Sequence, residues 1–178
     1  NRYMISASDT QVTNVGDLVV LSGDAALVDT AGFGVYPAVE RAASATASQV
    51  IGVVVGFEPD YSNLNTGAYR VASTRRVAFV ADSPDLIFAV PQDGTGGVVA
   101  AASVGLNCDI VVGTGASTAP YASTQMIDSS QVATTSTLPV QIVGVVASPE
   151  NDVTSTSRPA ELLVRINTHA FGGAGVAG

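Results

Sequence analysis

One histidine, His169, and one cysteine, Cys108, are the side chains of this 178-residue sequence best suited to nucleophilic catalysis. A Cys–His pair needs the two side chains in contact and a third group that orients the imidazole. They lie 61 residues apart in the sequence. We expect Cys108 to be a small buried side chain beside a strand at 110–112, and His169 to make a polar bond at a strand end. A Ser–His–Asp hydrolase would also depend on His169, and the Gly-x-Ser-x-Gly elbow is absent.

Two acidic segments could offer oxygen ligands. Asp82 and Asp85 flank Ser83-Pro84, and a second segment runs from Glu150 to Asp152. Such clusters can hold Ca²⁺, but neither has EF-hand spacing. A glycosidase could use two carboxylates, yet five Tyr, five Phe and no Trp supply a sugar-stacking cleft poorly. We interpret both segments as turns, and whether either binds a cation stays open.

Glycine-rich turns at 32–34 and 93–97 do not form a phosphate cradle. The turn at 93–97 lacks the lysine of a nucleotide-binding loop, and the whole chain has no Lys. The pair at 32–34 has no strand–helix–strand context. We predict no cofactor, no metal and no enzymatic activity.

All seven basic residues are arginines, whose planar guanidinium suits fixed, bidentate ion pairs. Adjacent residues of a strand point to opposite faces, so Arg75 and Arg76 should diverge. Intramolecular carboxylate partners are an equal alternative to partners across an interface. The predicted interface residues are Arg70, Arg75, Arg76, Arg158, Arg165 and Phe171.

Short apolar segments rich in Val and Ile must position these residues. Such side chains fit a pleated sheet, and Gly, Asp, Asn, Ser and Pro between them are typical of turns. The pattern predicts an all-β protein, a compact barrel or sandwich with one or two short helical turns at most, near 84–86 and 98–104. The expected strands are 18–21, 35–39, 50–57, 69–71, 77–80, 86–90, 110–112, 140–146 and 162–166.

The chain also repeats itself. Residues 17–23 resemble 109–115, and residues 49–54 resemble 141–146, both at an offset of 92. We therefore predict a β domain at 14–170 with a two-fold internal pseudo-repeat, its units at about 14–90 and 104–170, and these units form either one barrel or two lobes. Residues 1–13 are predicted to be an N-terminal arm, and the glycine-rich residues 171–178 a C-terminal tail.

Composition excludes several classes of function. A net charge of −8 argues against nucleic acid and against an anionic membrane surface as partners. The longest apolar run, 50–57, is far shorter than the roughly 20 residues of a membrane-spanning helix. The N-terminus does not have the apolar stretch of a signal peptide. One Cys excludes an intrachain disulfide. We expect a soluble protein made in a cytoplasm.

Four segments in a fixed order carry a family resemblance: 80–88, 104–111, 139–144 and 163–169. The series resembles decoration, or cement, proteins on the heads of tailed bacteriophages. Over residues 75–170, the resemblance implies a non-enzymatic β-rich virion protein. It would bind the capsid surface, bridge major capsid proteins and form a homo-oligomer, with a trimer favoured over a dimer. The alternative is a receptor- or glycan-binding β module of a phage spike or fibre, with an aromatic or carboxylate cluster in a shallow pocket.

Overall fold

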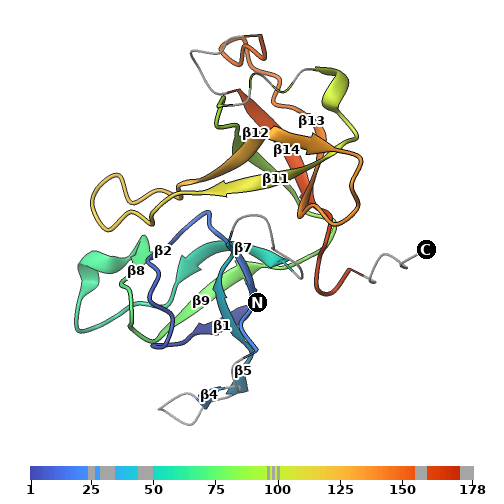
Figure 1. Cartoon of the computed structure of the whole chain (residues 1–178). Helices are drawn as coiled ribbons and strands as arrows, with labels where there is room; N and C mark the ends of the chain where they lie inside the picture. The colour runs from blue at the N-terminus through green and yellow to red at the C-terminus, as the bar shows by residue number, and fades with distance from the viewer. Residues whose placement is uncertain are drawn as a thin grey trace. The chain divides into compact units, whose positions relative to one another are not determined.

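A computed structural model describes residues 1–23, 27–28, 35–43, 50–95, 97, 99, 101–154 and 160–172. The all-β prediction is confirmed, since the helical elements of these residues are two short 3-10 turns, η1 (Leu64–Thr66) and η2 (Ala101–Ser103) (Figure 1). Within the same residues, no helix is long and apolar enough to cross a membrane.

The chain divides into two compact units. Unit 1 contains Asn1–Ala42, Val50–Asp82 and Gly113–Thr124, and unit 2 contains Ala43–Gln49, Ser83–Val112 and Gln125–Gly178. Each unit is therefore assembled from separated pieces of sequence. Of the two alternatives left open for the repeat, one barrel or two lobes, the chain has two compact units, and their boundaries differ from the predicted 14–90 and 104–170.

Unit 1 is a closed five-stranded barrel in the order β1-β6-β3-β7-β9. Strand β1 pairs with β6 in parallel, and every other neighbouring pair in the barrel is antiparallel. Two small two-stranded sheets, β2-β8 and β4-β5, accompany it. The strands are β1 (Arg2–Ile5), β2 (Thr13–Asn14), β3 (Leu18–Leu21), β4 (Leu27–Val28), β5 (Val35–Tyr36), β6 (Ala38–Arg41), β7 (Val50–Phe57), β8 (Tyr69–Arg70) and β9 (Arg76–Ala81).

The barrel core explains why β7 reads as a nearly continuous apolar run. Val50, Ile51 and Val54 are fully buried in it, and Val19 and Val39 complete the core from β3 and β6. β-Branched side chains are stiff at χ1, so they lose little freedom when they pack on a pleated strand.

The first residues are not the arm predicted at 1–13. Strand β1 lies between β6 and β9 in the barrel, and Tyr3, Met4 and Ile5 are each at most 2% exposed. The prediction was wrong because Arg2–Ile5 is short and begins with a charged residue. Its place is fixed by pairing with β9, 71 or more positions later in the sequence.

Unit 2 is a five-stranded sheet in the order β10-β14-β13-β11-β12, with all four ladders antiparallel. Its core includes Cys108, Ile110, Ile127, Ile142 and Leu162. A parallel bridge from Gln92 to Ile127 brings the end of β10 next to β12. The strands are β10 (Ile87–Pro91), β11 (Asn107–Val112), β12 (Gln125–Ala133), β13 (Val140–Val145) and β14 (Glu161–Ile166).

Both units have the same strand connectivity. In each, counted along the chain, the second main strand pairs with the third and fourth, and the fifth pairs with the fourth and first. The first and third are parallel, as a ladder in unit 1 and as one bridge in unit 2. The segments that repeat at an offset of 92 overlap the second strands, β3 and β11, and the fourth strands, β7 and β13. This shared connectivity supports the predicted internal repeat.

Asp93 joins the two outer strands of the unit 2 sheet. Its main-chain N–H donates to the Ile127 carbonyl at 2.9 Å, and its carboxylate accepts from the N–H and hydroxyl of Ser129 at 3.0 and 2.7 Å. Burial alone would raise the pKa of Asp93, but the hydrogen bonds from Ser129 and Thr95 outweigh it and lower the pKa to about 2.

Acid is therefore expected to destabilise unit 2 through Asp93. A carboxyl group whose pKa falls on folding adds stability above its unfolded pKa of about 3.9, and loses that stability as the pH falls toward 2. Urea denaturation between pH 5 and 2.5 should show a shallower loss of stability for Asp93→Asn than for the parent chain. If the free energy of unfolding fell equally steeply with pH in Asp93→Asn and in the parent chain, this role of Asp93 would be contradicted. The control is Asp85→Asn, at an exposed carboxylate, which should behave like the parent chain.

Candidate functional site

Cys108 and His169 have structural surroundings. Cys108 is fully buried, and burial raises the pKa of its thiol to about 12, which disfavours the nucleophilic thiolate. His169 Nδ1 accepts from the N–H groups of Phe171 and Gly172 at 3.0 and 3.1 Å. No hydrogen bond joins Cys108 to His169 in the described part of the chain. The imidazole holds the turn after β14, as expected of a polar bond at a strand end.

Each acidic segment includes a turn, at Pro84-Asp85 and at Pro149-Glu150. Asp82 accepts from Asn1 Nδ2 at 2.7 Å and from the Tyr3 hydroxyl at 2.6 Å, whereas Asp85 is exposed. Asp152 Oδ1 accepts from the N–H and hydroxyl of Thr154 at 2.8 and 2.6 Å. Among the described residues, no group of three or more His, Cys, Asp and Glu side chains could hold a metal ion.

Arg70 is not an interface residue. Its side chain is fully buried. Its guanidinium donates to the carbonyls of Ser6, Asp9, Gln11 and Thr74 at 2.6 to 2.8 Å. Nη1 also lies 3.2 Å from Asp9 Oδ2. Burial lowers the pKa of Arg70, and the charge of Asp9 opposes that effect. The prediction was wrong because the guanidinium cross-links a turn of its own unit.

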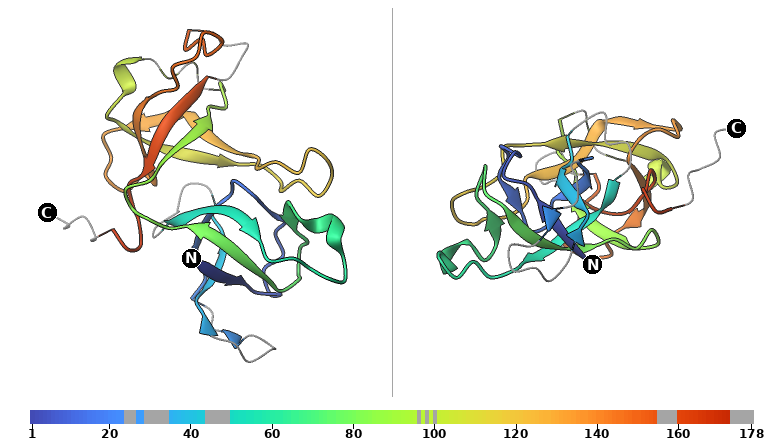
Figure 2. Two further views of the ribbon diagram at one scale, coloured as in Figure 1. Left: turned by 180° about the vertical axis from the view of Figure 1, so that it is seen from behind. Right: turned by 90° about the horizontal axis from the view of Figure 1, so that it is seen from below.

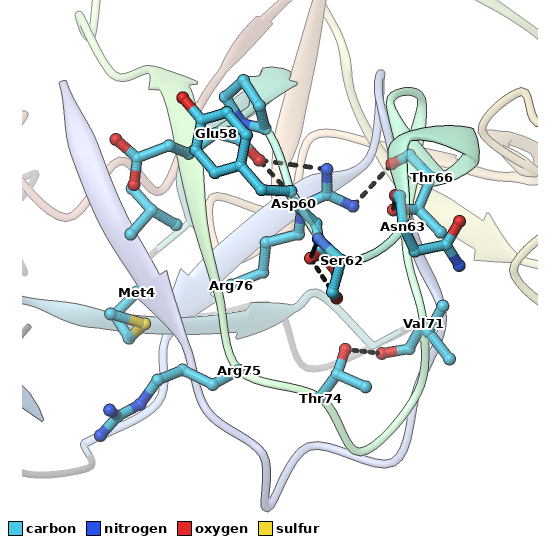
Figure 3. A pocket seen from close by; sticks show the side chains of 13 residues that line it. Met4, Glu58, Asp60, Ser62, Asn63, Thr66, Val71, Thr74, Arg75 and Arg76 are labelled. Atoms are coloured by element: carbon cyan, nitrogen blue, oxygen red, sulfur yellow. Dashed lines mark hydrogen bonds between the residues drawn. The ribbon is translucent and has the colours of Figure 1, made fainter. Parts of the chain in front are cut away.

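Arg75 and Arg76 diverge, as predicted, although Arg75 lies just before β9, which begins at Arg76 (Figure 3). Arg75 is exposed and makes no ion pair with any described residue. Arg76 is 8% exposed, lies 5.1 Å over the Phe57 ring, and donates to the carbonyls of Glu58, Thr66 and Tyr69. The prediction of Arg76 as an interface residue was therefore also wrong. Arg75, in contrast, remains accessible to a partner.

The remaining predicted interface residues belong to unit 2. Arg165 is exposed, and its Nε donates to Gln141 Oε1 at 2.8 Å. Phe171 is 57% exposed. Arg158 and residues 173–178 of the predicted tail lie outside the described residues.

A polar cluster that the sequence did not reveal fastens the loop 113–124 in unit 1. Figure 2 (left) shows this loop beside β8. The fully buried Asp17 is 2.8 Å from Arg41 Nε and accepts from the Ser123 hydroxyl at 2.5 Å. Asn14 Nδ2 donates to the carbonyl of Ala116 at 2.8 Å. These bonds stabilise the loop. They also engage the side chains of Asp17 and Arg41, which are therefore not available to bind a ligand.

A pocket of about 680 Å³ opens in unit 1 between the segment 58–66 and the segment 71–77 (Figure 3). Its volume is within the range of small-molecule sites. Figure 3 shows Asp60, Ser62 and Arg76 together near its centre, with Arg75 extending away from them at the edge. The lining residues are Met4, Glu58, Pro59, Asp60, Tyr61, Ser62, Asn63, Thr66, Val71, Thr74, Arg75, Arg76 and Val77.

Local turn chemistry orients the polar groups of this pocket. Asp60 Oδ1 accepts from the N–H and hydroxyl of Ser62 at 2.9 and 2.6 Å. These two bonds, the hydroxyl bond first, lower the pKa of Asp60, so the group is ionised at neutral pH. Asn63 Oδ1 caps η1 by accepting from Asn65 N at 3.2 Å. These bonds stabilise the turn at 60–62 and the start of η1.

Several hydrogen-bonding atoms of the pocket remain available. Among the described residues, Asp60 Oδ2 and Asn63 Nδ2 make no hydrogen bond. Arg76 Nη2 donates one hydrogen, to the Glu58 carbonyl at 3.1 Å, so its second hydrogen is also free. Tyr61 is 89% exposed beside them. The pocket can therefore offer an acceptor, donors and an aromatic face to one ligand.

Sequence reasoning missed this pocket. The run Asp60-Tyr61-Ser62-Asn63 directly after strand β7 was the available signal, but the same residue types are also typical of a turn. The run is indeed a turn, and its partner segment 71–77 is separated from it by η1 and β8.

The chain matches no family model, and neither a curated protein nor a solved structure matches it.

Proposed function

We propose that this chain is a capsid decoration protein, which binds the outer surface of a tailed-phage head, bridges major capsid proteins and stabilises the shell. Four ordered segments of the sequence resemble this family. The partners are the major capsid protein and further copies of the chain, as a homotrimer rather than a homodimer. The place of action is the virion surface, and the protein is made in the host cytoplasm.

Exposed apolar side chains on both units are the observation that carries the proposal. Tyr61, Leu64 and Val71 are 89, 73 and 40% exposed and come from the one segment 61–71, and Ile87 and Phe171 of unit 2 are 58 and 57% exposed. Only 12% of the residues are charged, so an interface formed by this chain would have few charges to desolvate. Apolar and aromatic side chains that become buried on association supply most of the stability of an interface.

Buried arginines give this chain the rigidity that a protein bridging capsid subunits requires. Arg70, within the exposed segment 61–71, donates to four main-chain carbonyls outside it, and Arg76 donates to the carbonyls of Thr66 and Tyr69 within it, so the segment is held at several points. A preorganised surface loses less conformational entropy on binding than a mobile one.

Leu64→Asp is expected to weaken binding to heads by at least about tenfold, because a carboxylate would have to be buried where an apolar side chain was. The measurement is co-sedimentation of purified protein with heads from which the protein has been stripped. Leu64 is the suitable position because it is exposed and does not line the pocket.

Ser117→Asp, an equal change of charge at another exposed position of unit 1, should bind like the parent chain. Stripped heads should burst at a lower temperature than decorated ones, and re-addition of the parent chain should restore their resistance. Heads that are equally resistant with and without the protein would overturn the stabilising role. Sedimentation of the free protein as a monomer or dimer would overturn the trimer.

A further inference from the structure

We propose that the pocket between segments 58–66 and 71–77 is a binding site for a neutral saccharide ring. This inference does not depend on the capsid role. It gives the alternative drawn from the sequence, a glycan-binding module, a defined place on unit 1. The argument combines the free hydrogen-bonding atoms, the balance of charge and the exposed aromatic side chain.

The free atoms of the pocket match a ligand that both donates and accepts. Asp60 Oδ2 can only accept, whereas Asn63 Nδ2 and the second Arg76 Nη2 hydrogen can only donate. A sugar hydroxyl does both, so adjacent hydroxyls on one ring can satisfy a carboxylate and an amide or guanidinium together. Ser62 fixes the Asp60 carboxylate at 2.6 and 2.9 Å before any ligand arrives, which reduces the entropic cost of binding.

The balanced charge of the pocket favours neither anions nor cations. Glu58 and Asp60 would repel a phosphate or a carboxylate, and Arg75 and Arg76 would repel a cation. Arg2 also lies 3.8 Å from Glu58, which balances part of that acidic charge. The lining holds two carboxylates and two guanidinium groups, so a neutral, polar ligand has the least electrostatic penalty.

Tyr61 supplies the apolar face that a sugar ring needs. It follows Asp60 directly and is 89% exposed, although isolated aromatic rings tend to bury part of their surface. The C–H face of a pyranose can stack on such a ring while its hydroxyls reach the polar atoms. The lack of Trp argued against a stacking platform in the sequence, but the exposed Tyr61 beside Asp60 offers a stacking surface for a single ring.

The test uses the isolated full-length chain and an array of neutral and acidic oligosaccharides, followed by NMR titration with the best-bound neutral saccharide. We expect saturable shifts of main-chain N–H signals in 58–63 and 74–77, with a dissociation constant in the millimolar range. Tyr61→Ala should weaken binding at least tenfold, and Asp60→Asn should also weaken it because an acceptor becomes a donor. Leu64→Ala, at an exposed position nearby that does not line the pocket, should bind like the parent chain.

Three results would overturn the proposal: no neutral saccharide bound by the folded protein, equal binding by Tyr61→Ala, or tighter binding of inorganic phosphate in the same NMR titration. No heads enter this assay, so its failure is distinct from a failure of the capsid role. Conversely, loss of head binding by Leu64→Asp together with normal saccharide binding would separate the two surfaces.

Discussion

Arg70→Met is expected to lower the free energy of unfolding by about 3–5 kcal/mol, the usual cost of breaking a buried charged pair. The substitution removes the donors of four main-chain carbonyls, those of Ser6, Asp9, Gln11 and Thr74. A carbonyl left buried without a donor retains the full cost of its desolvation. The Asp9 carboxylate also loses its cation, 3.2 Å away.

Arg75→Met is the matched control, five positions later in the same unit. Arg75 is exposed and has no ion pair in the described chain, so its loss should change stability by no more than about 0.5 kcal/mol. Urea denaturation followed by circular dichroism measures both variants. Equal stability of the two would show that the buried guanidinium contributes no more than a surface charge, contrary to our expectation.

Gly52→Ala is expected to destabilise unit 1 by at least about 3 kcal/mol, near the upper end for overpacking of a core. A Cβ at Gly52 would lie 2.1 Å from the Ala81 carbonyl oxygen and 2.9 Å from a Val80 methyl group. The first of these atoms belongs to the backbone of β9, which is paired with β7 and cannot rotate away. Relief would require the β7–β9 ladder to separate locally.

Gly144 provides the control at the corresponding place in unit 2, 92 residues later. A Cβ there would meet only the Leu163 side chain, at 3.6 and 3.9 Å, which is ordinary van der Waals contact. Gly144→Ala should therefore stay within about 1 kcal/mol of the parent chain. Thermal unfolding measures the stability of both variants. If Gly52→Ala were as stable as Gly144→Ala, the close approach of Gly52 to the Ala81 carbonyl would be contradicted.

Strands with their own apolar pattern could be located from the sequence. Residues 50–57 were predicted as a strand and form β7 at Val50–Phe57. Strand β12 (Gln125–Ala133) was not predicted, because the run Asp128-Ser129-Ser130-Gln131 has no apolar alternation. Pairing with β11 makes it a strand, and that contact is not encoded in the local pattern.

The candidate site was only partly accessible to sequence reasoning. The opposite orientations of Arg75 and Arg76 follow from strand geometry and could be predicted. The burial of Arg70 and Arg76 could not be predicted. Their acceptors are main-chain carbonyls, which every residue has, so no sequence motif indicates where such acceptors gather. Likewise, the turn residues Asp60, Tyr61 and Asn63 become a pocket only when segment 71–77 lies opposite them.

The sequence by itself determined the class of the fold, since frequent β-branched residues, short apolar runs and intervening turn residues permit little other than β-sheet. It also indicated the repeat, because identical spacing of similar strands is a local property of the chain. Tertiary structure alone decided that Arg2–Ile5 is part of the barrel, that the loop 113–124 belongs to unit 1, and which arginines are left exposed. The physical reason is that strand pairing and the burial of polar groups depend on partners distant in sequence, whereas periodicity and turn preference depend on neighbours.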